Sequence, residues 1–361
     1  MSRVSPRPEI AALPPSVHGG LDHGELARLT IHPDDVLDFS VNRNPFGPPP
    51  SVRAVWEGVS LERYPDRECL ALRSALAERH GCGMAQVWVG NGAAELIWLL
   101  ALTYLSTGDP MLVVTPTFGE YAAAGRVMGA RSKMFVARQR DDFYPDLDAL
   151  VIRMKKLRPR LTFLCNPNNP TGVYLEREVV KALLAANPSG LLVLDEAYAP
   201  FVENGWDSTP LLRSGRLVAL RSMTKDYALA GLRLGYLLAA EGIVGAVRRV
   251  QPPWSVNVIA QAAGLAALGD DAYLQDTLAQ TRAAAVELAR ELAALGLQVR
   301  PSATHFFLVK AGDAAATRSK LLRRGILVRD CTSFGLPAFV RIAARRPEEN
   351  QRLVAAWREL M

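Results

Sequence analysis

The chain has 361 residues, a formal net charge of +6 and a hydrophobic content of 49%. A chain of this length can bury a sizeable core and can form a large α/β domain with a smaller companion. The ordinary apolar fraction, with only 22% charged residues, excludes intrinsic disorder as the main state. Four scattered cysteines without a CxxC pair exclude a small disulfide scaffold and indicate reduced thiols.

The positive charge is spread along the chain. The 42 basic residues exceed the 36 acidic ones only mildly, and basic clusters such as Lys155-Lys156 and Arg345-Arg346 are pairs and not long tracts. This pattern favours a solvated surface or a positive pocket for a small anion over a nucleic-acid interface. No apolar run reaches the ~18 residues of a membrane span, and no secretory signal is recognisable. We therefore expect a cytoplasmic protein that binds neither nucleic acid nor membrane.

The first 45 residues are expected to form an irregular N-terminal arm that packs with the small domain. They include Pro14-Pro15, His18-Gly19-Gly20 and three of the five histidines. Residues 42–50 are rich in proline and glycine, which indicates a shaped loop.

Between residues 46 and 252, strand and helix patterns alternate. The expected strands are 86–89, 111–114, 133–136, 161–164, 191–194, 217–220 and 234–238. The expected helices are 69–80, 93–105, 121–128, 146–156 and 176–186. The strands are continuous apolar runs, which indicates burial on both faces of a mostly parallel sheet. The order predicts a three-layer αβα domain with a seven-stranded sheet.

The composition changes after about residue 250, and residues 253–361 are expected to form a smaller α+β domain. Ala-rich helices are expected at 258–268 and 276–295, and a closing helix at 347–360. Short strands are expected at 305–310, 325–329 and 339–342.

Polar motifs follow several of the expected strands, at the edge where open α/β sheets bind ligands. Gly90–Glu95 forms a turn into a helix whose free N–H groups suit a phosphate. Other strand ends lead into Thr115–Phe118, Cys165–Gly172, Asp195–Tyr198 and Arg221–Lys225, with Arg233 beyond. Each motif alone is a weak signal, since an isolated Asp at a strand end is more often a turn former. Their combination and order carry the prediction.

The set resembles the fold-type I enzymes that use pyridoxal 5′-phosphate, over nearly the whole chain. The most specific matches are Asn166–Gly172 (NPNNPTG), Asp195–Tyr198 (DEAY), Ser222–Lys225 (SMTK) and Ala230–Gly235 (AGLRLG). Within that superfamily the chain is similar to the branch of histidinol-phosphate aminotransferase and threonine-phosphate decarboxylase. Asn42–Gly47, Arg63–Asp66 and Gly325–Asp330 carry this closer similarity.

The resemblance implies roles for the catalytic and ring-binding residues. Lys225 would bind the cofactor as a Schiff base and move protons at the substrate. Asp195 would pair with the pyridinium nitrogen and keep the ring electron-withdrawing. Tyr198 and Asn166 would hydrogen-bond the ring hydroxyl oxygen. Phe118 would stack on the ring face.

Further contacts are implied for the phosphate and the substrate. The cofactor phosphate would be held by Gly92, Ala93, Ala94, Ser222, Thr224 and Arg233, and by Tyr64 from the partner subunit of a homodimer with active sites at its interface. Ala93 and Ala94 stand where relatives often have hydroxyl or acidic side chains, so backbone amides would contribute more there. The implied substrate contacts are His18, Asn42, Asn166, Arg329 and Arg341. Of these, Arg341 would clamp a carboxylate and Arg329 a substrate phosphate.

Two reactions fit the resemblance, because the orientation of the substrate carboxylate decides which bond breaks. The first expectation is decarboxylation of L-threonine O-3-phosphate to (R)-1-aminopropan-2-yl phosphate in cobalamin biosynthesis. His18-Gly19-Gly20, Arg329–Cys331 and Phe339–Asn350 favour it. The alternative is transamination of histidinol phosphate, or of a related aromatic or phosphorylated amino donor, with 2-oxoglutarate.

Two other interpretations have less support. A non-catalytic effector-binding module of this fold would need an added DNA-binding domain, and Lys225 and Asp195 are both present here. A metal site at His18, His23 and His32 lacks an accompanying set of ligands, so we expect no metal.

Overall fold

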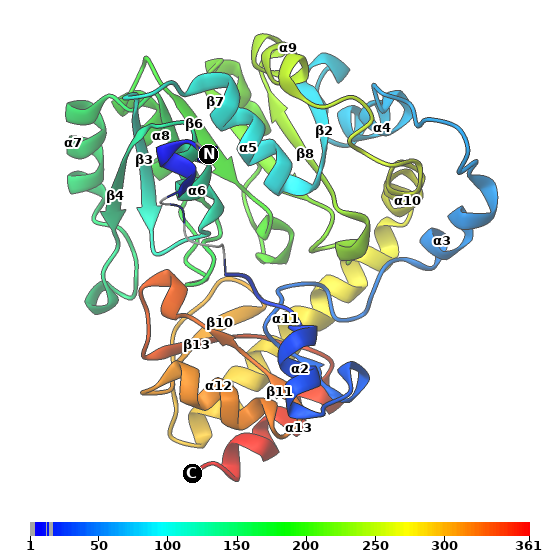
Figure 1. Ribbon diagram of the computed structural model, residues 1–361, viewed down its shortest axis with the longest axis vertical. Coiled ribbons are helices and arrows are strands. Elements are labelled where there is room, and N and C mark those ends of the chain that lie inside the picture. Colours follow the sequence, from blue (N-terminus) through cyan, green and yellow to red (C-terminus); the bar gives the residue numbers. More distant parts are fainter. Residues whose placement is uncertain (1–3, 12, 14–16) are drawn as a thin grey trace.

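The computed structural model describes residues 4–11, 13 and 17–361; residues 1–3, 12 and 14–16 of the expected arm, including Pro14-Pro15, lie outside this range. A seven-stranded mixed sheet forms the centre of the large domain (Figure 1), which confirms the predicted fold class. Its order is β2-β8-β7-β6-β5-β3-β4, and β8 runs antiparallel to both of its neighbours. The strands are β2 (Val87–Asn91), β3 (Pro110–Thr115), β4 (Arg131–Val136), β5 (Leu161–Cys165), β6 (Leu191–Asp195), β7 (Leu217–Ser222) and β8 (Leu234–Ala239).

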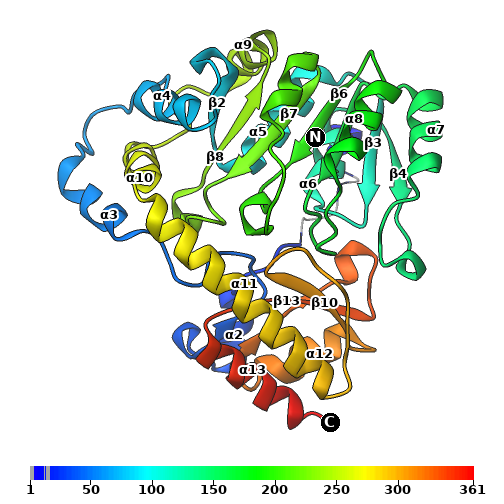
Figure 2. The same cartoon turned by 180° about the vertical axis from the view of Figure 1, so that it is seen from behind.

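Helices cover both faces of this sheet (Figure 2). Successive strand residues point to opposite faces, so in β6 Leu192 and Leu194 join one core cluster and Val193 joins the other. The first cluster includes α4 (Leu70–Arg79), α7 (Leu147–Leu157), α8 (Arg177–Ala186) and α10 (Val258–Leu268). The second includes α5 (Gly92–Tyr104), α6 (Glu120–Val127) and α9 (Glu241–Val250). The central strands are therefore buried on both faces, as their apolar runs predict.

Strand β4 departs from this pattern. It lies at the edge of the sheet, paired only with β3. Arg131, Lys133, Met134 and Val136 are exposed, so the expectation that every strand is buried on both faces is wrong for β4. Charged side chains on an edge strand discourage pairing with other chains.

The smaller domain has a four-stranded sheet of order β12-β13-β10-β9. Its strands are β9 (Gln298–Val299), β10 (Phe306–Lys310), β12 (Arg329–Asp330) and β13 (Phe339–Ala343). Helices α11 (Asp271–Ala294), α12 (Ala314–Leu322) and α13 (Pro347–Arg358) accompany it. The strand expected at 325–329 is divided. Its first part, β11 (Ile326–Leu327), pairs with β1 (Leu37–Asp38) in a separate two-stranded sheet, and β12 pairs with β13.

The N-terminal segment is more regular than expected. It contains the short helix α1 (Pro8–Ala11), α2 (His23–Leu29) and β1. The Asp22 side chain caps α2 by accepting a hydrogen bond from the Glu25 amide. Leu26 then packs against Leu322 and Leu327 of the small domain. Between the two cores, α11 contributes Leu274 to the large-domain cluster and Leu288 to the small-domain cluster.

All four cysteines are free thiols. Within residues 4–11, 13 and 17–361, no helix is long and apolar enough to cross a membrane. The same residues contain no group of three or more His, Cys, Asp or Glu side chains placed to hold a metal ion.

The core assignment can be tested on one helix. Leu100 of α5 is fully buried, whereas Leu102 is half exposed. We expect Leu100→Ala to lower the free energy of unfolding by about 2–5 kcal/mol, because it leaves a cavity. Leu102→Ala should change it by less than about 0.5 kcal/mol. Urea unfolding of both variants measures the difference, and equal effects would contradict the packing described here.

Candidate active site

Two connected cavities lie where β5, β6 and β7 end. The inner cavity is lined by Ala93, Asp195, Ser222 and Thr224, among others. The outer cavity, of about 750 Å³, reaches the small domain and the arm at His18, Asn42, Arg329 and Arg341. Both share the lining residues Ala94, Phe118, Asn169, Tyr198, Lys225 and Arg233. The structure thus brings together most of the predicted site residues.

A lining suited to an anion forms part of the inner cavity. Ala93 and Ala94 lie in the first turn of α5, where backbone N–H groups have no partner within the helix. The hydroxyls of Ser222 and Thr224 lie 2.7 Å apart. The guanidinium of Arg233 completes this part of the lining. Helix N-terminus, hydroxyls and guanidinium together match the chemistry of a phosphate.

Glycines allow the chain to pack this closely. Gly235 of β8 pairs with Ser222 on one side and with Gly90 on the other. A Cβ atom at Gly235 would lie 2.4 Å from the Ala93 amide nitrogen. Gly92 has φ +79°, and a Cβ atom there would lie 3.0 Å from the Arg233 guanidinium. Gly92 lines neither cavity itself, but it precedes Ala93 and Ala94, which line the inner cavity.

Asp195 is the last residue of β6 and is buried. Its Oδ2 accepts a hydrogen bond of 2.6 Å from the Tyr121 hydroxyl, and its Oδ1 accepts one of 3.0 Å from the Ala197 amide. Burial raises the pKa of Asp195, and these two donors oppose the shift. The carboxylate is therefore placed to pair with a cationic ligand group.

Lys225 lies three residues beyond the end of β7 and lines both cavities. Burial, followed by the charges of Arg341 and Arg233, lowers its pKa to about 8. Near neutral pH a useful fraction of the amine is therefore unprotonated and nucleophilic. Its Nζ lies 5.8 Å from the centroid of the Tyr198 ring.

Aromatic side chains form the walls. Phe118 borders both cavities and meets Tyr121 edge-on at 5.7 Å. Tyr198 is buried, and burial raises the pKa of its phenol, so the hydroxyl keeps its proton. A planar ligand ring would find an aromatic face at Phe118 and a hydroxyl donor at Tyr198.

Asn169, and not Asn166, lies at the cavities. Both amide atoms of Asn166 bond the backbone of Leu175: Nδ2 donates to its carbonyl over 3.0 Å, and Oδ1 accepts from its amide over 2.7 Å. The Asn169 side chain lines both cavities and accepts a hydrogen bond from Arg341. The roles predicted for Asn166 therefore have no geometric support here, and Asn169 is the asparagine placed to meet a ligand.

Two arginines face the outer cavity from neighbouring strands, since Arg329 of β12 is the cross-strand partner of Arg341 on β13. Arg329 donates to the Val17 carbonyl over 2.7 Å and to the Ser333 hydroxyl over 2.8 Å. Arg341 donates to Asn169 and to the Ser40 carbonyl. Among the described residues neither forms an ion pair, so both charges remain available to an anionic ligand.

The arm supplies the remaining predicted contacts. His18 Nε2 lies 3.2 Å from Glu120 Oε1, and its ring centroid lies 5.7 Å from that of Phe118. Asn42 is buried in the wall of the outer cavity, where its side chain interacts with the Tyr198 phenol. Tyr64 borders neither cavity; it is exposed and stacks on Trp254 at 4.4 Å.

Comparison with known proteins shows the family to which this chain belongs. A family model described as aminotransferase class I and II matches residues 34–356. The chain belongs to this family. Two relatives named histidinol-phosphate aminotransferase support the assignment. The one from Moorella thermoacetica is 36% identical over 335 residues, covering 91% of this chain and 86% of the relative. The one from Symbiobacterium thermophilum is 37% identical over 357 residues, covering 98% and 97%.

Two solved structures have folds similar to that of this chain. The histidinol-phosphate aminotransferase of Sinorhizobium meliloti, in complex with pyridoxal-5′-phosphate, has a TM-score of 0.86 at 27% identity, covering 100% of this chain and 98% of that one. The L-threonine-O-3-phosphate decarboxylase of Porphyromonas gingivalis has a TM-score of 0.77 at 27% identity, covering 89% and 98%.

The inner cavity fits the cofactor of the class I and II aminotransferases, and the cofactor prediction is confirmed: pyridoxal 5′-phosphate is the cofactor. The anion-binding lining at α5 and Arg233 matches its phosphate. Asp195 offers a buried carboxylate for a ring nitrogen, and Lys225 offers an amine for the aldehyde.

Two glycine substitutions test the anion-binding lining of the inner cavity. Gly235→Ala should raise the dissociation constant of pyridoxal 5′-phosphate by tenfold or more, because the added methyl group would displace the first turn of α5. Gly231→Ala is the matched control, since a Cβ atom there meets nothing within 4 Å. Titration of the two apoproteins measures both constants, and equal constants would contradict the packing around Ala93.

The amine of Lys225 should show its lowered pKa in the rate of cofactor attachment. The neutral amine is the nucleophile, so the rate should rise with pH and level off above about pH 8. Stopped-flow absorbance of apoenzyme mixed with cofactor gives the profile, with Lys225→Ala as the blank. A rate still rising steeply beyond pH 10 would mean that burial does not shift the amine.

Proposed function

We propose that this chain transfers the amino group of histidinol phosphate to 2-oxoglutarate. The observation that carries the proposal is the 36–37% identity, over 91–98% of the chain, to relatives named histidinol-phosphate aminotransferase. The positions of the buried arginines support it.

The reaction has two different anionic substrates, which bind one after the other in the same cavity. Histidinol phosphate carries a phosphate and no carboxylate, whereas 2-oxoglutarate carries two carboxylates. Arg329 and Arg341 are neighbours across two strands, and neither forms a salt bridge with another described residue. Guanidinium groups bind phosphate and carboxylate with the same bidentate geometry. Both substrates can therefore use these arginines in turn.

The protein's own groups then move the proton. When bound, pyridoxal 5′-phosphate would supply an electron-withdrawing ring that makes the Cα–H bond of the substrate amine acidic. Lys225, as a neutral amine within the cavity, would take the proton from Cα and carry it on Nζ. Asp195 would pair with the ring nitrogen and keep it protonated. Phe118 and Tyr198 would hold the ring and exclude water from one side.

Decarboxylation of L-threonine O-3-phosphate, the first expectation from sequence, is the second candidate. One observation favours it: His18 lies at the outer cavity beside Phe118, where it can meet a small phosphorylated substrate. The similarity in structure to the Porphyromonas gingivalis decarboxylase agrees with this. The sequence relatives favour transamination, so decarboxylation stands second.

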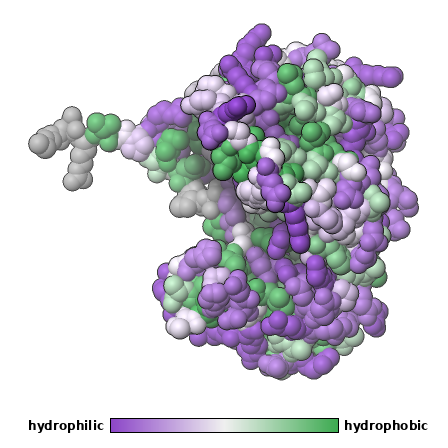
Figure 3. Space-filling model, turned by 90° about the vertical axis from the view of Figure 1, so that its right-hand side faces the viewer, coloured by the Kyte–Doolittle hydropathy of each residue, from purple (hydrophilic) through white to green (hydrophobic). Residues whose placement is uncertain are grey.

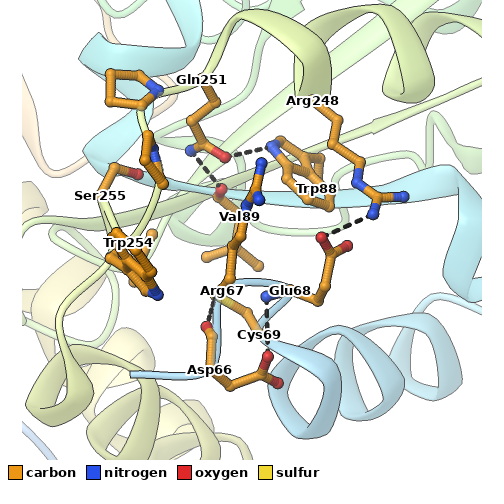
Figure 4. Close-up of a pocket in the computed structure, with 13 residues that line it drawn as sticks. Asp66, Arg67, Glu68, Cys69, Trp88, Val89, Arg248, Gln251, Trp254 and Ser255 are labelled. Atoms are coloured by element: carbon orange, nitrogen blue, oxygen red, sulfur yellow. Dashed lines mark hydrogen bonds and ion pairs between the residues drawn. The ribbon is translucent and has the colours of Figure 1, made fainter. Parts of the chain in front are cut away.

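The active site is further proposed to be completed in a homodimer. Tyr64 is 77% exposed, and Trp254, on which it stacks, borders a surface hollow with Arg67 and Arg248 (Figure 4). Exposed aromatic residues of this kind are typical of protein interfaces. A Tyr64 that borders no cavity in its own chain can serve as a phosphate contact for the partner's cavity.

One pair of assays separates the two reactions. Holoenzyme is incubated with histidinol phosphate and 2-oxoglutarate, and glutamate is measured; in parallel it is given L-threonine O-3-phosphate, and carbon dioxide is measured. We expect glutamate and no carbon dioxide, and neither product from Lys225→Ala. Carbon dioxide without glutamate would replace the first proposal with the second, and the absence of both products would overturn the two together.

A further inference from the structure

Tyr121 is a buried phenol to which none of the predicted roles refers. It lies in the first turn of α6, has no exposed surface and borders the inner cavity. Its hydroxyl donates the 2.6 Å hydrogen bond to Asp195 Oδ2. Its ring stacks on Phe163 at 4.9 Å with an interplanar angle of 9°, and it meets Phe118 edge-on at 82°. Two aromatic contacts and one hydrogen bond therefore fix the position of the Tyr121 side chain.

We propose that Tyr121 is a positioning residue that fixes the Asp195 carboxylate for the ring nitrogen of the cofactor and keeps that carboxylate ionised. The inference rests on the cofactor and on no choice of substrate, so it holds for either reaction.

The hydrogen bond has a defined direction. Burial, followed by the charge of Asp195, raises the pKa of Tyr121 well above its usual value, so the phenol keeps its proton and donates. Burial also raises the pKa of Asp195 and favours its neutral form. The Tyr121 hydroxyl and the Ala197 amide oppose that shift. Loss of one of these two donors should therefore leave the carboxyl group less acidic.

Other groups near Asp195 do not replace this donor. Cys165 is its cross-strand partner on β5; burial raises the pKa of this thiol to about 12, and Sγ already contacts the Pro167 carbonyl at 3.2 Å. The Tyr198 phenol also stays neutral because burial raises its pKa. The charge of Lys225 also lowers the pKa of Asp195, but that charge is lost above about pH 8, and Lys225 is the proposed attachment point of the cofactor.

The test removes one hydroxyl and keeps the ring. Tyr121→Phe is compared with Tyr236→Phe, a buried tyrosine that lines neither cavity and whose hydroxyl lies 2.8 Å from His80 Nε2. Two quantities are measured: the dissociation constant of pyridoxal 5′-phosphate, and the pH midpoint of the visible absorbance band of the holoenzyme.

We expect Tyr121→Phe to weaken cofactor binding about tenfold, as for loss of a hydrogen bond to a charged group. The absorbance midpoint should rise by about half a pH unit or more, because a less protonated ring withdraws less charge from the lysine nitrogen. Tyr236→Phe should leave both quantities at the wild-type values. Thermal unfolding shows whether each variant loses a similar amount of stability.

A double-mutant cycle makes the inference specific to Asp195. In an Asp195→Asn background, Tyr121→Phe should shift the midpoint no further, because the carboxylate on which it acts is gone. A Tyr121→Phe protein with wild-type affinity and midpoint would overturn the proposal and leave the phenol a packing role. An additive effect in the Asp195→Asn background would overturn it as well. Failure of the wild-type protein to bind pyridoxal 5′-phosphate would instead contradict the assignment of this cofactor.

Discussion

The site depends on holding a lysine amine and an aspartate carboxylate out of water in the same pocket. Asp195 ends β6 and Lys225 follows β7, so adjacent parallel strands bring them together. Burial lowers the pKa of the lysine and raises that of the aspartate, which drives both toward their neutral forms. Neutral Lys225 is the form that attacks a carbonyl, whereas pairing with a cationic ring nitrogen would need an ionised Asp195. The hydrogen bonds from Tyr121 and Ala197, together with the charge of Lys225, oppose the shift at Asp195 and favour its ionised form.

The surrounding positive charge follows from two further features of the fold. Arg233 has a left-handed backbone and lies beside Gly92, which places it near the first turn of α5 in the inner cavity. Arg329 and Arg341 meet because the segment expected as one strand at 325–329 is divided between two sheets. Its second part pairs with β13 and brings Arg329 opposite Arg341. Part of the net charge of +6 therefore lines the cavities of the site.

Sequence predicts the strand-end residues well, because a parallel sheet collects them at one edge whatever the details of the loops. It therefore places Asp195 and Lys225 in one pocket. It does not choose among the asparagines of NPNNPTG, since that choice depends on the path of the loop, in which Asn166 bonds the Leu175 backbone and Asn169 reaches the cavities. The sequence does not predict a role for Tyr121, because a tyrosine on a helix face usually belongs to the hydrophobic core. Its position three residues after Phe118 is the one feature of the sequence that could have indicated the site. The exposure of β4 is likewise a matter of strand order, which local apolar patterns do not encode.

The central claim, that the buried amine at position 225 holds the cofactor, has a direct test. Cofactor-loaded protein is reduced with borohydride, digested and mapped by mass spectrometry, which fixes the attached group on the lysine that binds it. The account predicts a pyridoxyl phosphate adduct on the peptide that contains Lys225, and its loss in Lys225→Ala. An adduct confined to another lysine, or none in the wild-type protein, would contradict it.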